Sequence, residues 1–361
     1  MDPGRPFTHN SRHPPTNSTA NDMTKPGLPR NTHVLVSPLV GDAGQAAIAE
    51  LAAGAGSGIT LVPATSGLRQ HELDRVDAAF FSRDIFSMPG RPPSNDGTRL
   101  FFRLLDACPR LKWLHIFSAG SDRAKYRELR ARGISITASP DASGTAVATS
   151  VLAGILALNK RLQWHHANQL ARTWRAMPDE LCPAPLDRQT AVLIGTGHIG
   201  AALAKFLQSL GLRTIGVNRS GRAVPGFDET VPQAHLDGVV DKADWLVICC
   251  PLTDETRNLI DAGRLARLPR EAHLVNVGRG GIVDEPALVR ALREKRISGA
   301  YLDVFEREPL PPESEIWSLD NVMLTPHSAA RIADFNDRVF AGFLDNLHRW
   351  ITGRPLVNVA A

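Results

Sequence analysis

Strand-length apolar runs alternate with helix-length segments over most of this chain, in two series. A long helical stretch, Thr145–Leu162, separates them. Such alternation indicates parallel sheets with helices on their faces, and near-continuous apolar runs are typical of strands covered on both sides. The expected strands lie at 33–37, 59–63, 76–82, 111–117 and 134–137 in the first series, and at 191–194, 214–217, 245–249, 274–277, 300–304 and 322–324 in the second.

The chain of 361 residues has the length of about two domains, and the alternation divides it accordingly. We expect a first α/β domain over residues 32–144 and a second over 145–329, each with a Rossmann-like or flavodoxin-like parallel sheet. Ala329–Trp350 is helical with one broad apolar face. We expect residues 330–361 to complete the first domain. Residues 1–31 are rich in proline and polar side chains, which predicts a flexible tail.

Composition and charge argue against several classes of protein. Lys plus Arg is 41 and Asp plus Glu is 37, a net charge of +4, without a basic arm or stripe that would track nucleic acid. The longest apolar stretches are interrupted by polar residues, so no membrane span is expected. Cys108, Cys182, Cys249 and Cys250 lack metal-ligand spacing, and residues 1–31 lack the apolar core of a secretory signal. We therefore expect free thiols, no metal and a cytoplasmic protein.

The motif GTGHIG, residues 195–200, follows an expected strand and opens a helix-like segment, the context that a dinucleotide-binding turn requires. Gly195 permits the tight turn, Gly197 lets the backbone approach a pyrophosphate, and Gly200 allows close packing of helix and strand. The helix N-terminus then offers free N–H groups to the anion. The alternative is a glycine-rich turn without a ligand.

The end of the next strand predicts which dinucleotide is bound. An acid there would bond the ribose 2′-hydroxyl of NAD(H) and repel a 2′-phosphate. The chain has Asn218, Arg219 and Ser220 instead, and 213–227 contains no Asp or Glu. Arg219 and Ser220 are suited to a 2′-phosphate. This favours NADP(H), with NAD(H) and a merely solvated Arg219 as the alternative.

Three polar residues in the second half each follow an expected strand, at the end where open α/β sheets bind ligands. They are Arg279, Glu308 and His327. Taken singly, each also fits a plainer role, as a paired surface charge or a structural histidine. Glu306 is the alternative to Glu308 as a partner for the histidine.

In chain order, the motifs GTGHIG, NVGRGGIVDE, YLDVFEREPLPP and LTPHSA resemble those of the D-isomer-specific 2-hydroxyacid dehydrogenase family, which includes glyoxylate/hydroxypyruvate reductases. The resemblance covers roughly Val34 to Ile351. It implies a substrate-binding domain over 32–144, an NAD(P)-binding domain over 145–329, and an active site in the cleft between them. It also implies a homodimer formed largely through the cofactor domains, and a small 2-oxo acid such as glyoxylate or hydroxypyruvate as substrate.

The family assigns roles that suit the three residue types. Arg279 would clamp the substrate carboxylate and carbonyl oxygen through its planar fork. His327 would donate the proton to the developing alkoxide, and Glu308 would bond its other ring nitrogen and favour the imidazolium form. Backbone N–H groups of the loop at Ala119, Gly120 and Ser121 would bind the substrate carboxylate. The further dinucleotide contacts that the resemblance implies are His198, Ile199, Pro251, Thr256, Val277, Asp303 and His327.

Two departures from the family pattern lie near the expected hinge. Thr149 stands where many relatives carry Glu, and Ser139-Pro140 where many carry Asn. They leave the identity of the substrate open. The alternative among enzymes is a member of the formate- or phosphite-oxidising branch. A dehydrogenase-like scaffold that senses nucleotides without turnover is the alternative outside enzymes.

Overall fold

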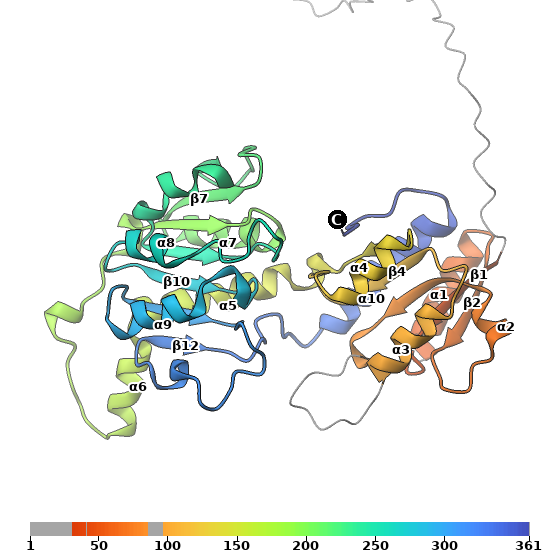
Figure 1. The fold of residues 1–361 in the computed structure, drawn as a ribbon, viewed down its shortest axis with the longest axis horizontal. Coiled ribbons are helices and arrows are strands. Elements are labelled where there is room, and N and C mark those ends of the chain that lie inside the picture. The colour runs from red at the N-terminus through yellow and green to blue at the C-terminus, as the bar shows by residue number, and fades with distance from the viewer. Residues whose placement is uncertain (1–30, 41, 86–96, 361) are drawn as a thin grey trace, which may run out of the picture.

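The fold is described from a computed structural model that covers residues 31–40, 42–85 and 97–360. Figure 1 shows two bodies, each with its own sheet, joined by the chain around α5 and by the segment that leads into α10. The expected tail, residues 1–31, lies outside the described residues except for Asn31, which begins the first strand.

The first body contains a five-stranded parallel sheet in the order β2-β1-β3-β4-β5. This is the flavodoxin-like strand order. The strands are β1 Asn31–Val36, β2 Gly58–Pro63, β3 Val76–Phe81, β4 Trp113–Ile116 and β5 Ser135–Thr137. The helices between them are α1 Asp42–Gly54, α2 Gln70–Leu73, α3 Gly97–Asp106 and α4 Ala124–Ala131.

The C-terminal helix α10, Phe335–Ile351, packs against this first sheet. Its buried Phe343 stacks on Phe80 of β3 with ring centroids 4.3 Å apart. The chain after α10 returns to β5, where the N–H of Ala360 donates to the carbonyl of Ile136 at 2.8 Å. The last residues therefore belong to the same folded unit as the first strands.

The second body contains a seven-stranded parallel sheet in the order β12-β11-β10-β9-β6-β7-β8. Relative to β6 this is the Rossmann order, extended by one strand, and its switch point lies between β6 and β9. The strands are β6 Thr190–Ile194, β7 Arg213–Asn218, β8 Glu229–Pro232, β9 Trp245–Ile248, β10 His273–Asn276, β11 Gly299–Leu302 and β12 Val322–Leu324. The helices are α7 His198–Ser209, α8 Ala262–Arg267 and α9 Glu285–Arg293.

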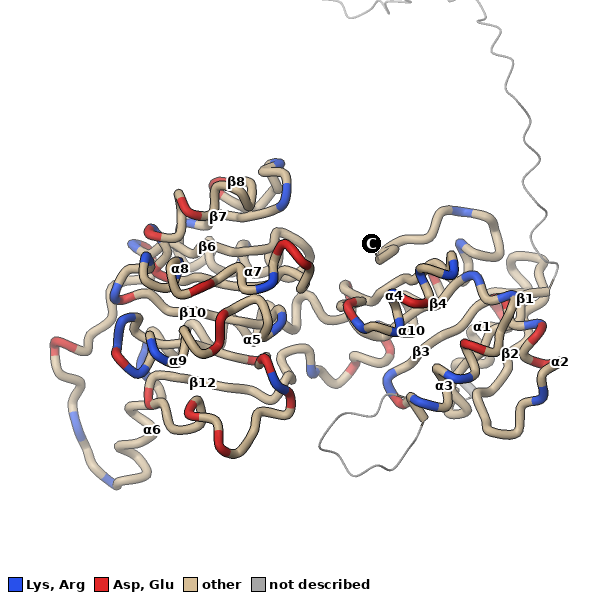
Figure 2. Tube along the Cα trace, in the orientation of Figure 1, with Lys and Arg blue, Asp and Glu red and all other residues tan. Residues whose placement is uncertain are grey.

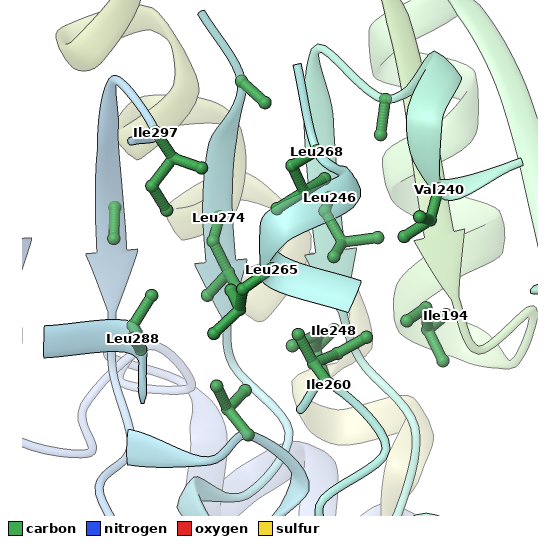
Figure 3. Close-up of a cluster of buried hydrophobic side chains, with 14 of the residues drawn as sticks. Ile194, Val240, Leu246, Ile248, Ile260, Leu265, Leu268, Leu274, Leu288 and Ile297 are labelled. Atoms are coloured by element: carbon green, nitrogen blue, oxygen red, sulfur yellow. The ribbon is translucent and has the colours of Figure 1, made fainter. Parts of the chain in front are cut away.

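Buried aliphatic side chains hold the seven-stranded sheet to its helices. Figure 3 shows Leu246, Ile248 and Leu274 of the strands meeting Leu265 of α8 and Leu288 of α9. The expectation of two parallel-sheet α/β domains is thus confirmed. Figure 2 shows acidic and basic residues interspersed along both bodies, in keeping with the small net charge.

Helix α5 lies at the connection between the two bodies, and helix α6 projects from the second body. Helix α5, Pro140–Asn159, packs against α7 and β11, and α6, Leu162–Leu170, projects with the following loop away from the second body (Figure 1). Within the described part of the chain, α5 is the one helix with the length and apolar composition of a membrane span. Its Val147, Val151 and Ile155 lie in the core of the second body, so burial explains its composition.

The structure differs from the expected elements mainly at helix ends. Helix α5 begins at Pro140 rather than Thr145, since proline suits the first helical turn. Helix α10 begins at Phe335 rather than Ala329, and the N–H of Ala329 is bonded to the Asp303 carboxylate. Strand β8 has no fully buried residue and therefore no apolar run to predict it. The short 3-10 segments are Arg83–Ile85, Asp179–Leu181, Leu186–Arg188, Gln233–Gly238, Val240–Lys242, Gly280–Ile282 and Glu315–Ser318.

The departure at Ser139 forms part of a buried hydrogen-bond chain. Ser139 donates its hydroxyl to the carbonyl of Ile116 at 2.9 Å and therefore accepts from Nε2 of His115 at 3.0 Å. Nδ1 of His115 then accepts from the Thr137 hydroxyl, which in turn accepts from the indole N–H of Trp113, both at 2.8 Å. Burial lowers the pKa of His115 to about 3, so this ring is neutral and structural.

Candidate active site

The glycine loop lies at the carboxyl ends of β6 and β9, at the switch point of the Rossmann sheet. Gly195 has φ +112°, and a Cβ at this position would lie 2.9 Å from the backbone of Cys249 and of Cys250. A Cβ on Gly200 would lie 2.1 Å from the carbonyl oxygen of Gly195, whereas one on Gly197 would meet nothing within 4 Å. Two glycines are therefore required by packing, and the third leaves the N-terminus of α7 open to a ligand.

The loop after β7 is folded by the side chain of Asn218. Its Oδ1 accepts from the N–H groups of Ser220 and Gly221, at 3.1 and 2.7 Å. Its Nδ2 donates to the hydroxyl of Thr196 in the glycine loop at 3.3 Å. Arg219 is exposed on this loop. The pKa of Glu255, on the loop after β9, is lowered mainly by a hydrogen bond with Thr253, and the charge of Arg219 contributes less. The loop expected at the adenosine ribose is thus bonded directly to the glycine loop expected at the pyrophosphate.

Arg279 follows β10 and reaches the first body. Its Nε and Nη2 donate to the two carboxylate oxygens of Asp122 at 3.1 and 3.0 Å, and Nη1 donates to the carbonyl of Gly278 at 2.8 Å. Asp122 directly follows the loop Ala119–Ser121, at the carboxyl end of β4. A Cβ on Gly120 would lie 1.9 Å from Nη2 of Arg279, so glycine allows this approach. The structure therefore brings the predicted clamp and the predicted carboxylate-binding loop together.

Asp122 and Glu308 have pKa values below their ordinary range for related reasons. Burial by itself would raise the pKa of Asp122, but the hydrogen bond and the charge of Arg279 lower it overall. Burial by itself would likewise raise the pKa of Glu308. The hydrogen bond from His327 lowers this pKa overall, and the charge of Arg279 lowers it by a smaller amount. Both carboxylates are thus kept ionised by cationic or hydrogen-bonding neighbours.

Glu308 and His327 form a close pair from the loops after β11 and β12. Nδ1 of His327 lies 2.7 Å from Oε2 of Glu308, and Oε1 of Glu308 accepts from the N–H of Phe305 at 3.1 Å. The His327 side chain keeps 43% of its exposure and that of Glu308 33%, so the pair is accessible. The other glutamate considered, Glu306, is exposed and contributes its backbone N–H to Glu285 instead.

Asp303 shapes the loop that carries His327. One of its carboxylate oxygens accepts from the Thr325 hydroxyl at 2.6 Å and from the N–H of Ser328 at 2.8 Å. The N–H of His327 donates to the carbonyl of Asp303 at 2.9 Å, and His327 itself has φ +49°. Non-glycine residues in this conformation need such support, and they concentrate at functional sites. A direct contact of Asp303 with the dinucleotide stays a prediction.

The other expected dinucleotide contacts surround the same edge of the sheet. Thr256 is buried and donates its hydroxyl to the carbonyl of Pro251 at 2.8 Å, which closes the loop after β9. Val277 and Ile199 lie in or against the core. His198, the first residue of α7, pairs with Asp141 of α5 at 2.7 Å. Their contacts with a dinucleotide also stay predictions.

A cavity of about 200 Å³ adjoins the His327–Glu308 pair. Its lining is mostly apolar, and the remaining residues are Phe305, Pro309, Leu310, Trp317, Leu324 and Pro326. This volume is below the range of sites for drug-sized ligands and suits a small molecule.

Sequence reasoning missed two residues that the geometry places at this site, Asp122 and Glu285. Asp122 ends a loop that was expected to act only through backbone N–H groups, and no local pattern indicates that its partner lies 157 positions away. Glu285 ends the motif NVGRGGIVDE, and nothing in that motif indicates that its carboxylate accepts from the N–H of Glu306. Both contacts depend on how loops from different strands meet.

Comparisons with known proteins agree with this geometry. The model of the NAD binding domain of D-isomer specific 2-hydroxyacid dehydrogenases matches residues 152–329. The chain is similar to glyoxylate reductase from Thermofilum pendens, with 36% identity over 65% of this chain and 70% of that protein.

Two solved structures extend the likeness over 91% of this chain and 98% of theirs, each with a TM-score of 0.70. One is a D-isomer specific 2-hydroxyacid dehydrogenase from Xanthobacter autotrophicus in complex with NADPH and MES, 30% identical. The other is an NADPH-dependent glyoxylate/hydroxypyruvate reductase from Sinorhizobium meliloti in complex with NADP and sulfate, 28% identical.

The glycine loop yields a paired stability prediction. Gly200→Ala should destabilise the protein by about 1 to 3 kcal/mol, because its Cβ would press on the carbonyl of Gly195 and force α7 away from β6. Gly197→Ala is the matched control and should lower the melting temperature less, since its Cβ meets open space and its φ of −76° is allowed, and only the N-cap preference for glycine is lost. Thermal unfolding of both variants checks this, and equal melting temperatures would contradict it.

Proposed function

Because the chain belongs to the D-isomer-specific 2-hydroxyacid dehydrogenase family of NAD(P)-dependent enzymes, we propose that it reduces small 2-oxo acids, such as glyoxylate or hydroxypyruvate, with NADPH. The observation that carries this proposal is the 2.7 Å contact between His327 and Glu308, on loops beside Arg279. An anion clamp, a proton donor and a residue that orients the donor are what this reduction demands of a protein.

The glycine loop and the N-terminus of α7 would hold the pyrophosphate, and the loop at Asn218 the adenosine ribose. The open space at Gly197 fits a ligand there, as do the close contacts that demand Gly195 and Gly200. When bound, the dinucleotide supplies the hydride for the carbonyl carbon. The chain supplies the binding, the orientation and the proton.

Arg279 can hold the substrate without releasing Asp122. A guanidinium has five N–H donors, and three are engaged here by Asp122 and Gly278. One N–H on each terminal nitrogen remains for the substrate carboxylate or carbonyl oxygen. Backbone N–H groups of Ala119, Gly120 and Ser121 would complete the carboxylate site, at the junction of the two bodies.

The proton step follows from the pair. His327 would donate the proton from its free ring nitrogen, Nε2, to the oxygen that becomes the hydroxyl. The Glu308 carboxylate on Nδ1 fixes the ring and stabilises the imidazolium before transfer. One 2-oxo acid, one NADPH and one proton thus give one 2-hydroxy acid and NADP⁺.

The acid–base prediction tests this pair directly. His327→Ala should lower turnover about 10²- to 10⁴-fold and leave NADPH binding nearly intact. Reduction should fall as pH rises, because the protonated ring is the donor, and Glu308→Gln should move that falling limb to lower pH, since the charge favouring imidazolium is gone. Steady-state rates against pH with hydroxypyruvate are the measurement. Near wild-type activity in His327→Ala would show that this residue is not the proton donor. A wild-type protein that binds NADPH without turnover would favour the alternative of a scaffold that senses nucleotides.

The dinucleotide preference rests on Arg219 and the acid-free loop around it. Arg219→Ala should weaken NADPH binding by about 1.5 to 3 kcal/mol, the range for a charged hydrogen bond, and leave NADH binding unchanged. Arg213→Ala is the matched control, because Arg213 begins the same strand and pairs with Glu229. Binding titrations with both dinucleotides decide the matter. A wild-type preference for NADH, or unchanged selectivity in Arg219→Ala, would refute this preference.

We also propose that two copies assemble through the second body. The projecting segment around α6 exposes apolar side chains, Leu162 at 52%, Leu170 at 72% and Trp174 completely, which a second copy would cover. Leu170→Glu combined with Trp174→Glu should convert a dimer to a monomer in light scattering after size exclusion. Leu39→Glu, equally exposed but on the first body, should not. A monomeric wild type would contradict this proposal.

A further inference from the structure

Glu285 is the first residue of α9, yet its carboxylate binds outside its own helix. The helix is capped by Asp284, whose Oδ1 accepts from the N–H of Ala287 at 2.9 Å. Oε2 of Glu285 instead accepts from the N–H of Glu306 at 2.8 Å, in the loop that follows β11. The side chain therefore joins two loops at the carboxyl edge of the sheet.

This bond acts on the loop that carries Glu308. Two consecutive N–H groups of that loop are each held by a carboxylate, Phe305 by Glu308 and Glu306 by Glu285. Gly280, next to Arg279, presses on the same turn, since a Cβ there would lie 1.9 Å from the carbonyl carbon of Phe305. The segment from Arg279 to Glu285 thus contacts the Glu308 loop at two points, of which the Glu285 contact is directional.

The electrostatic surroundings of Glu285 are unfavourable to a carboxylate. Burial raises its pKa, and the nearby charges of Glu306 and Glu308 raise it further, against the lowering effect of the Glu306 N–H. Arg279 and His327 lie at the same edge and lower the pKa of Glu308. The carboxylates of Asp303 and Asp122 are also there, bonded to the turn of His327 and to Arg279. A glutamate that served only the helix dipole would gain nothing from lying among acids. Its position is accounted for by the bond to the loop.

We propose that Glu285 is a positioning residue that holds the His327–Glu308 pair in fixed register with Arg279. The inference rests on the proposed function, because it concerns the geometry in which the donor and the clamp meet a 2-oxo acid. Glu285 touches neither substrate nor dinucleotide. It acts through Glu306, and it needs an acceptor oxygen rather than a charge.

Three variants test whether this position needs an acceptor oxygen or a negative charge. They are Glu285→Ala, Glu285→Gln and the control Glu294→Ala. Glu294 is exposed at the other end of α9. In Glu285→Ala we expect kcat for hydroxypyruvate to fall about 10- to 100-fold, because small displacements of reacting groups have effects of this order, while the NADPH Kd stays within about twofold. Glu285→Gln keeps the acceptor and should restore kcat to within about threefold of wild type. Glu294→Ala should behave as wild type.

A readout independent of turnover uses the ring signal of His327, assigned in proton–carbon NMR spectra by its loss in His327→Ala. In Glu285→Ala, the pH dependence of the His327 chemical shift should move toward the one seen in Glu308→Gln. In Glu285→Gln, this pH dependence should remain as in the wild type. A wild-type enzyme without turnover would overturn the proposed function alone, since the NMR arm would still report on Glu285. Wild-type kcat and an unchanged His327 signal in Glu285→Ala, or failure of Gln to rescue, would overturn the inference.

Discussion

Parallel pairing of the strands is the constraint on which the site depends. In both sheets every strand runs the same way, so each strand ends at the same edge and each following loop starts there. The glycine loop, the Asn218 loop, Arg279, Glu308 and His327 come from five strands of one sheet. Gly195 and His327, which lie 132 positions apart in the chain, are thereby gathered at one edge of the sheet.

Carboxylates and an amide then hold these loops by binding backbone N–H groups. Asp303 binds the turn of His327. Glu308 and Glu285 bind the turn at 305–306. Asn218 binds the loop that follows β7. Loops at a sheet edge would otherwise have few partners, because the backbone there has left the strand ladder. Rigid presentation of the polar groups is what a site of this kind requires.

The sequence predicted the parts of this arrangement that are local. Apolar runs indicated most of the strands, and the glycine spacing indicated the turn, because each depends on residues near one another in the chain. Strand β8 escaped detection because it is only half-buried and so has no apolar signature. Asp122 and Glu285 escaped because their partners lie on other loops. Tertiary hydrogen bonds, unlike periodicity, leave no mark on the sequence around a residue.

The proposed reaction is hydride transfer to the carbonyl carbon of a 2-oxo acid that Arg279 holds and whose carbonyl oxygen His327 protonates. The most direct measurement is the reduction of hydroxypyruvate with NADPH deuterated at the transferable position, followed by chiral analysis and mass spectrometry of the product. We expect D-glycerate that carries the deuterium on its hydroxyl-bearing carbon. Glycerate without deuterium, or the L isomer, would contradict it.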